Sequence, residues 1–390
     1  MRFLLSVLFA FTVSTTAEKV SYENYKVFRM SVKQEHEVNF LKDLVASRDG
    51  FTFWSGLSIA IPTGVMVAPK DLKYFIEQMD SSSIKYEMIV NNVQDLINRQ
   101  LAGIGNGTDE FGWKRYHTLD EIYNWMDSLP KKYPVVKVIK QVELPKEWIS
   151  PATTTFLINE LLTSKEPSVR ALAESYDWYI FPMLNPDGYV YAHTTDRMWS
   201  KSRSHWDSDC IGVDLNRNWG YMWMEVGASN DPCSAKYAGR APFSEIETYT
   251  MSRYLSLIQD KLFAYITFHS FAQLLRVPYG YSTGHFDNYN ETYAIGLKAA
   301  DALARRYGTK YTLGSVAEVL YPAAGIAVDW VKAVLKLPIV FSYDLPDKGN
   351  FGMMLPAEQI IQNGQEILDS LIALFEEAGK FGYPQNYSSK

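Results

Sequence analysis

In the first part of the chain, apolar side chains recur either at every second position, as in a strand, or at every third or fourth position, as in a helix. Residues 25–32 alternate apolar with other side chains, which predicts a strand, and residues 35–47 carry an apolar stripe, which predicts a helix. Two short strands, a second helix that begins at Pro69 and a last strand follow, with the strands at residues 51–54, 64–67 and 84–90. This β-α-β-β-α-β order is typical of a ferredoxin-like fold. We therefore expect residues 18–100 to form a small α+β domain.

The next stretch, residues 101–115, shows neither the strand period nor the helix period. It contains Gly103, Gly105 and Gly107, which predicts a linker. Arg99 before it and the pair at 114–115 are candidate cleavage sites for an activating trypsin-like protease. Basic residues are equally typical of an ordinary solvated surface, so both interpretations stay open.

Residues 116–380 form a second unit, in which capping residues mark the helix starts. Thr118 and Glu121 make a capping box, and the helix that begins there is expected to stop near Pro130. Ser150 and Pro151 predict the start of another helix, which runs to residue 162. Ser244 and Glu247 make a second capping box, which predicts a helix to about residue 258.

Three dense apolar runs lie between and after these helices, at residues 178–184, 263–268 and 337–345. Continuous runs of this length suit strands that are covered on both faces. An amphipathic pattern over residues 357–375 predicts a closing helix. We therefore expect an α/β fold, with a mixed central sheet and helices on both faces.

The N-terminus indicates the compartment. Arg2, an apolar stretch over residues 3–13 and small residues at 14–17 form the pattern of a secretory signal peptide over residues 1–17. In an oxidising environment the two cysteines, Cys210 and Cys233, can pair in one disulfide. We expect a secreted, extracellular protein.

Composition excludes several partner classes. The 390 residues carry a net charge of -6, whereas a nucleic-acid surface needs clustered Lys and Arg. No apolar run reaches the roughly 18 residues that a membrane-spanning helix requires. We expect neither a nucleic-acid partner nor a membrane partner.

Six short motifs follow one another in the second unit. They are Glu147-Trp-Ile-Ser-Pro-Ala-Thr, Asn185-Pro-Asp-Gly-Tyr, Arg197-Met-Trp, Gly212-Val-Asp-Leu-Asn-Arg-Asn-Trp, His269-Ser-Phe-Ala-Gln-Leu-Leu and Tyr321-Pro-Ala-Ala-Gly. With them the chain resembles the secreted zinc carboxypeptidases of the carboxypeptidase A/B family. The small N-terminal domain resembles that family's activation segment. The resemblance implies a peptidase acting on peptide or protein C-termini, a zinc ion, and a disulfide between Cys210 and Cys233; we also expect a monomer.

The resemblance also assigns roles to single residues. Glu147 and His269 match two of the family's three zinc ligands, and such a zinc activates a water molecule. Asn216, Arg217 and Tyr321 match the residues that grip the substrate's terminal carboxylate, a task for which the planar guanidinium is suited.

In the family, the residue at the position of Val328 determines which C-terminal side chain is preferred. Because this side chain is apolar, an active enzyme is expected to prefer apolar or aromatic C-terminal residues.

Four positions depart from the family pattern. The first zinc ligand falls on Leu144, which has no lone pair to donate, and the oxyanion Arg falls on Ser200. The general-base Glu falls on the shorter Asp344, and the Arg beside the zinc motif falls on Lys146. Loss of charge stabilisation or of base placement typically costs about two to four orders of magnitude in rate. These departures predict impaired or absent catalysis.

The segment between Pro134 and Glu147 is short. It holds one strand of average length, whereas the family pattern threads several strands there. Glu143 does not replace the lost ligand, since neighbouring side chains of an extended segment point to opposite sides. Either the protein is degenerate, or the sequence lacks an internal piece.

Three functions remain open. The first is an active zinc exopeptidase made as a zymogen. The second is a pseudoenzyme that binds peptide C-termini through Asn216, Arg217 and Tyr321. The third is a structural or interaction protein in which even this grip is a relic.

Overall fold

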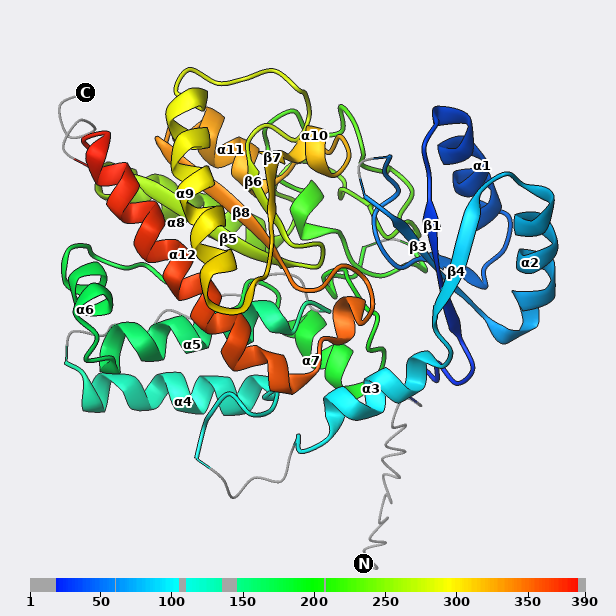
Figure 1. The fold of residues 1–390 in the computed structure, drawn as a ribbon, viewed down its shortest axis with the longest axis horizontal. Coiled ribbons are helices and arrows are strands. Elements are labelled where there is room, and N and C mark those ends of the chain that lie inside the picture. The colour runs from blue at the N-terminus through cyan, green and yellow to red at the C-terminus, as the bar shows by residue number, and fades with distance from the viewer. Residues whose placement is uncertain (1–18, 60, 105–109, 135–145, 207, 385–390) are drawn as a thin grey trace, which may run out of the picture.

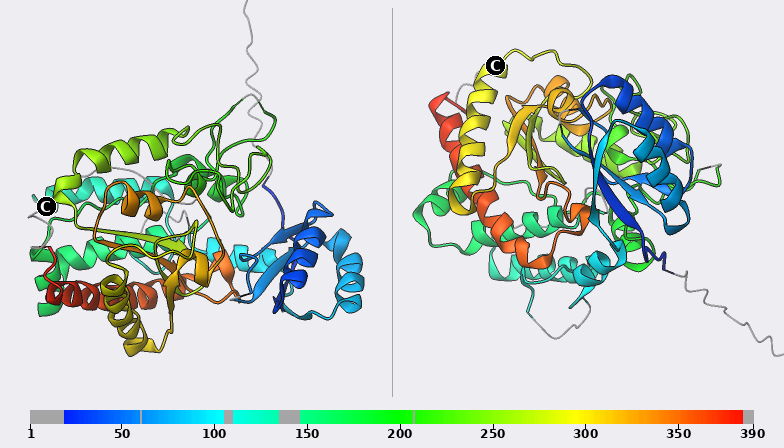
Figure 2. Two further views of the ribbon diagram at one scale, coloured as in Figure 1. Left: turned by 90° about the horizontal axis from the view of Figure 1, so that it is seen from above. Right: turned by 45° about the vertical axis from the view of Figure 1, so that its right-hand side comes forward.

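The computed structural model describes residues 19–59, 61–104, 110–134, 146–206 and 208–384. A small domain lies at one end of the molecule, beside a larger domain in which helices lie on both sides of a sheet (Figures 1 and 2). The expected signal peptide falls outside the described residues. Within them, no helix combines the length and the apolar character needed to cross a membrane.

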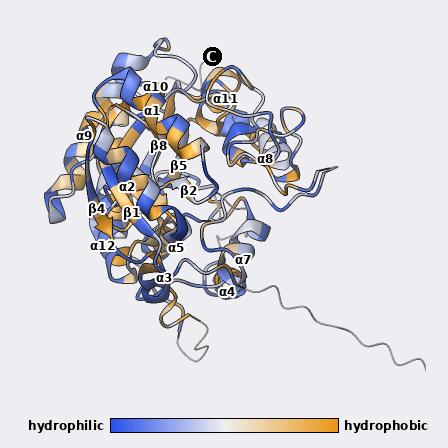
Figure 3. Cartoon of the chain, turned by 90° about the vertical axis from the view of Figure 1, so that its right-hand side faces the viewer, coloured by the Kyte–Doolittle hydropathy of each residue, from blue (hydrophilic) through white to orange (hydrophobic). Residues whose placement is uncertain are grey.

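The small domain is a four-stranded antiparallel sheet with the strand order β2-β3-β1-β4. Phe28 and Met30 of β1 pack with Leu41 and Phe75 of two helices in one apolar cluster. Those helices carry both hydrophilic and hydrophobic residues along their length, as expected where one face is buried (Figure 3). The elements are β1 (Lys26–Ser31), α1 (Glu35–Ala46), β2 (Phe51–Phe53), β3 (Thr63–Val67), α2 (Leu72–Ser81) and β4 (Lys85–Val90).

The predicted ferredoxin-like order is therefore present. Helix α3 (Val93–Leu101), which follows β4, was not predicted; the Asn92 side chain caps it by accepting from the backbone N–H of Gln94. Other side chains of the small sheet, with Trp54 and Met66, pack against Phe271 and Met354 of the larger domain. The small sheet is thus covered on both faces.

The larger domain is built around a mixed four-stranded sheet of order β5-β8-β6-β7. β5 and β8 are parallel, β8 and β6 antiparallel, and β6 and β7 parallel. The strands are β5 (Ala264–Ser270), β6 (Leu274–Val277), β7 (Thr312–Ser315) and β8 (Ile339–Leu345). The helices are α4 (Leu119–Lys132), α5 (Ile149–Thr163), α6 (Pro167–Glu174), α7 (Pro186–Thr194), α8 (Ile246–Leu257), α9 (Tyr289–Tyr307), α10 (Val316–Val319), α11 (Ala327–Ala333) and α12 (Ile360–Lys380).

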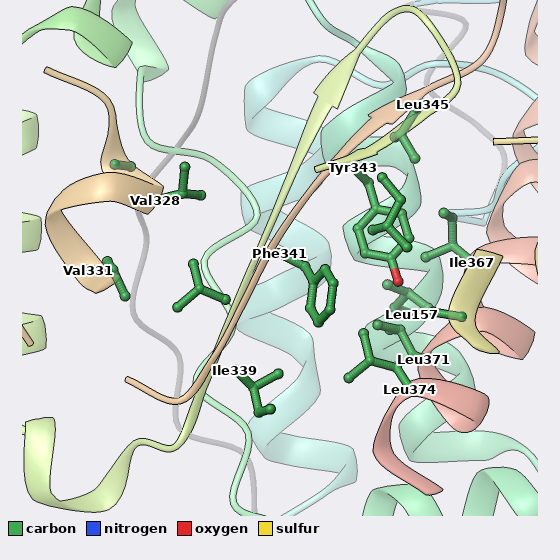
Figure 4. Close-up of a cluster of buried hydrophobic side chains, with 14 of the residues drawn as sticks. Leu157, Val328, Val331, Ile339, Phe341, Tyr343, Leu345, Ile367, Leu371 and Leu374 are labelled. Atoms are coloured by element: carbon green, nitrogen blue, oxygen red, sulfur yellow. The ribbon is translucent and has the colours of Figure 1, made fainter. Parts of the chain in front are cut away.

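The core lies on both sides of β8. Phe341 and Tyr343 point toward Leu371 of α12, whereas Val328 and Val331 of α11 lie on the opposite side of the strand (Figure 4). Every residue of β8 is buried, which explains why this strand appears in the sequence as a continuous apolar run.

Two expected features of the larger domain are wrong. Residues 178–184 form no strand among the described residues; they border a cavity together with β5. Ser244 makes no capping box either, because its hydroxyl contacts Glu245 and Asn218, and α8 begins at Ile246 with no side-chain cap.

Several helix ends also differ from expectation; α12, for example, ends at Lys380, five residues after the predicted end. α5 begins at Ile149, one residue before the predicted cap, so Pro151 lies within the first turn, where its missing N–H costs no helical hydrogen bond. α4 continues two residues past Pro130 to Lys132.

Candidate functional site

The two predicted zinc ligands lie together. Glu147 precedes α5 and His269 lies in β5; Oε2 of Glu147 is 3.2 Å from Nδ1 of His269, and both residues are buried. Leu144 and Glu143 lie outside the described residues. Among the described residues, no group of three His, Cys, Asp or Glu side chains is placed to hold a metal ion. Catalytic zinc usually takes three protein ligands, so this donor pair alone does not fit a catalytic zinc site.

Asp344, at the general-base position, is held by a cation that sequence analysis missed. Nη2 of Arg276 donates to Oδ1 of Asp344 at 2.5 Å and to Oγ of Ser342 at 3.0 Å. Burial raises the pKa of Asp344, and the charge of Arg276 opposes that rise. The signal in the sequence was an Arg inside the apolar run Leu274–Val277, where an unpaired charge would be very costly.

The three residues predicted to form a carboxylate grip lie together. Asn216 and Arg217 lie in a 3-10 helix at Leu215–Arg217, capped by the side chain of Asp214, which accepts from the backbone N–H of Asn216. The Arg217 guanidinium donates to the carbonyl oxygens of Gly227 and Asn216 at 2.9 and 2.7 Å, and to the hydroxyl of Tyr321 at 3.4 Å.

Two cations, Arg217 and Lys236, and one carboxylate, Asp214, act on the grip; Oδ2 of Asp214 lies 3.9 Å from Nη1 of Arg217. Burial alone would raise the pKa of Tyr321, but the charges of Arg217 and Lys236 bring it below its ordinary value. Nζ of Lys236 lies 4.5 Å from the centre of the Tyr321 ring. A carboxylate placed here would meet a guanidinium, a phenol and a nearby ammonium group.

Val328 is buried at the start of α11, next to a second group that sequence analysis missed. The carboxylate of Asp329 accepts from the backbone N–H of Gly280 at 2.9 Å and of Tyr281 at 3.2 Å, and burial raises its pKa to about 7. Oδ1 of Asn216 accepts from the backbone N–H of Ala327 at 3.0 Å, so the grip is tied to this helix.

Arg197 does not replace the Arg that the family has at Ser200. Its guanidinium donates to Oε1 of Gln100 at 2.8 Å and to the backbone oxygens of Lys146 and Met353 at 2.9 Å each. Burial lowers its pKa to about 9. Arg197 is therefore held as a structural cation that joins α3 to the larger domain.

The small domain lies against the grip. Gly56 packs so closely that a Cβ atom there would lie 2.5 Å from Cε1 of Tyr321. Trp54 donates its indole N–H to the carbonyl oxygen of Gly349 at 3.2 Å, and Arg29 donates to the side chain of Asn350 at 2.7 Å. The small domain thus covers Tyr321.

A cavity of about 370 Å³ opens elsewhere in the larger domain. It is bordered by residues 175–182 on one side and by residues 261–268, which include most of β5, on another. Its lining is mostly apolar, and it includes the buried indole N–H of Trp178, which has no partner among the described residues.

Two family models match this chain. The model described as "Zinc carboxypeptidase" matches residues 145–370, and the one described as "Carboxypeptidase activation peptide" matches residues 28–100. The first spans more than half of the chain. The chain belongs to the zinc carboxypeptidase family. The small domain is accordingly its activation domain, and Cys210 and Cys233 form the predicted disulfide, with Cα atoms 5.0 Å apart.

Curated relatives agree with this assignment. "Zinc carboxypeptidase A 1" of Drosophila melanogaster is 37% identical, covering 95% of this chain and 96% of its own length. "Zinc carboxypeptidase" of Simulium vittatum is 45% identical, covering 69% of this chain and 98% of its own length.

The Drosophila relative is longer than this chain over the aligned part. It extends over 413 positions but covers 95% of 390 residues, which is about 370 residues. About 40 residues of that relative therefore have no counterpart in this chain.

Solved structures share the fold. Thrombin-activatable fibrinolysis inhibitor superposes with a TM-score of 0.83 at 27% identity, covering 92% of this chain and all of its own. Carboxypeptidase A of Helicoverpa armigera superposes with a TM-score of 0.80 at 24% identity, covering 92% of this chain and 98% of its own.

Proposed function

We propose that this protein is a secreted member of the zinc carboxypeptidase family that binds peptide C-termini and whose hydrolytic activity is impaired or absent. The observation that carries the proposal is the assembled grip of Asn216, Arg217 and Tyr321. A planar guanidinium with a phenol beside it suits a terminal carboxylate.

The impairment is supported by three separate features. Glu147 and His269 are two donors where three are usual, Ser200 supplies no cation for an oxyanion, and Asp344 is paired with Arg276. Were zinc bound, it would supply polarisation of the scissile carbonyl, and Glu147 and His269 are the residues that would hold it.

The activation domain is expected to limit access to the grip until it is displaced, because Gly56 lies on Tyr321. A trypsin-like protease remains the proposed activator, acting on an extracellular monomer. The disulfide supports an oxidising compartment.

The alternative is an active zinc exopeptidase with an apolar or aromatic preference at the terminal residue. Two observations favour it: the alignment that holds about 40 unmatched residues, and the largely apolar cavity beside β5. Both are expected if the natural chain carries an additional internal piece before Glu147.

Binding and hydrolysis are tested together on the full chain, before and after limited trypsin treatment, with zinc supplied. We expect binding of peptides with a free C-terminal carboxylate, loss of that binding in Arg217→Ala, and hydrolysis of an apolar C-terminal substrate far below ordinary family rates. Hydrolysis at ordinary rates would refute the impairment, and unchanged affinity in Arg217→Ala would refute the grip.

The alternative is tested by reading the messenger RNA across the codons for Pro134 to Trp148. An in-frame insertion that ends in His-x-x-Glu would restore the third ligand and favour the active enzyme. An uninterrupted short segment would exclude that explanation.

A further inference from the structure

Arg276 does more in this site than neutralise Asp344, because of where it projects. The antiparallel pairing of β6 with β8 places Arg276 opposite Ser342, and the parallel pairing of β5 with β8 places His269 opposite Asp344. Side chains alternate along a strand, so these four residues project from one face of the sheet. The odd-numbered residues of β8 face α12 instead, and α11 lies on the opposite side of the strand (Figure 4).

Only part of the Arg276 guanidinium is used. Nη2 reaches both Asp344 and Ser342, while the buried Nε has no hydrogen-bond partner among the described residues. A buried N–H without a partner is unfavourable, so an oxygen atom brought to Nε by a ligand would be bound favourably.

The guanidinium also lies within electrostatic reach of the grip and of α11. Its charge adds to those of Arg217 and Lys236, which together outweigh the effect of burial on the pKa of Tyr321. It also opposes the rise that burial causes in the pKa of Asp329. Asn216 holds the first turn of α11 through the backbone N–H of Ala327, and Gly280, four residues after Arg276, donates its backbone N–H to Asp329, the neighbour of Val328. The chain thus joins the grip, the first turn of α11 and the end of β6 that carries Arg276.

We propose that Arg276 and Asp344 together select peptides whose C-terminal residue is glutamine or asparagine. The ion pair is neutral overall and sets a donor beside an acceptor. A carboxamide matches it, since its oxygen accepts from Arg276 and its NH₂ donates to Asp344.

Other terminal side chains match this pair less well. A carboxylate would face Asp344, an ammonium group would face Arg276, and an apolar side chain would leave both without a new partner. The inference rests on the proposed function, because Arg217 and Tyr321 must hold the terminal carboxylate. It differs from the preference that Val328 alone predicts.

Calorimetric titration of the full chain, before and after limited trypsin treatment, tests the inference. The probes are tetrapeptides that differ only in their last residue, Gln, Glu, Leu or Lys, with an amidated Gln peptide as the control for the terminal carboxylate. We expect the Gln peptide to bind at least about tenfold more tightly than the Glu, Leu and Lys peptides, as hydrogen bonds to charged groups would give. Tightest binding of the Glu or Leu peptide would overturn the inference.

A double variant isolates the ion pair. Arg276→Met with Asp344→Leu replaces both charges by apolar side chains, so neither is left unpaired. The variant should lose the preference for Gln over Leu and still reject the amidated peptide. A wild-type chain that accepts the amidated peptide refutes the proposed function, and this inference with it. If binding by the wild type requires the free carboxylate but shows no preference for Gln, the inference is refuted and the proposed function is not.

Discussion

At the scale of the residue, the site depends on which charges are buried together. Arg276 and Asp344 expose only 7% and 5% of their surface, and each charge is stabilised in the interior by the other. Asp344 was identified from the resemblance to the family, as the position of its general-base Glu. Arg276 was not, because no motif carries it and its partner is 68 positions away.

The ion pair makes a prediction about stability. Arg276→Met is expected to lower the free energy of unfolding by about 3–5 kcal/mol, because it leaves the carboxylate of Asp344 buried without its cation. Adding Asp344→Leu should recover most of that loss. Chemical denaturation of both variants measures the difference.

The exposed pair Arg306–Asp369, joined at 2.7 Å, provides the control. Arg306→Met should cost no more than about 1 kcal/mol, because solvent screens this pair. Equal losses in Arg276→Met and in the double variant would contradict the argument.

At the scale of the element, a sequence signal predicts a helix start correctly where all the hydrogen-bond partners of the cap lie in the same helix end. Thr118 accepts from the backbone N–H of Glu121, and the Glu121 side chain accepts from the backbone N–H of Thr118, as the capping box predicts. The same spacing at Ser244 fails, because Asn218, which is distant in sequence, donates to the Ser244 hydroxyl. A tertiary contact there replaces the local one.

The capping box at α4 is open to a direct test. Thr118→Ala should lower the free energy of unfolding by about 1 kcal/mol, since a backbone N–H at the first turn loses its acceptor. Thermal or chemical denaturation measures the change. Thr118→Ser keeps the hydroxyl and should stay close to wild type; a loss as large as that of the Ala variant would show that the cap is not the cause.

At the scale of the whole molecule, the activation domain and the larger domain share one interface. Trp54, Gly56 and Arg29 contact the larger domain, and the buried Gln100 of α3 accepts from Arg197. Gly56 matters because a larger residue would meet the ring of Tyr321. We therefore expect access to the grip to depend on docking of the activation domain.

This coupling predicts the effect of Gly56→Val. Overpacking typically costs about 1–3 kcal/mol, so docking should weaken by about fivefold or more. The intact chain should then bind a free-carboxylate peptide more tightly than the intact wild type, as titration would measure.

Gly379→Ala is the matched control, because a Cβ atom there has nothing within 4 Å. It should leave peptide binding unchanged. Unchanged binding in Gly56→Val as well would mean that docking does not limit access to the grip.

The sequence by itself determined the family, the ferredoxin-like order of the small domain, strands β5 and β8, and the positions of Glu147, His269, Asn216, Arg217 and Tyr321. These follow from short motifs and local periods, in which neighbours along the chain carry the information. Only the tertiary structure decided that Arg276 pairs with Asp344, that residues 178–184 border a cavity, and that Gly56 covers Tyr321. Each of these depends on strand register or domain docking, which joins residues far apart in sequence and leaves no periodic signal along the chain.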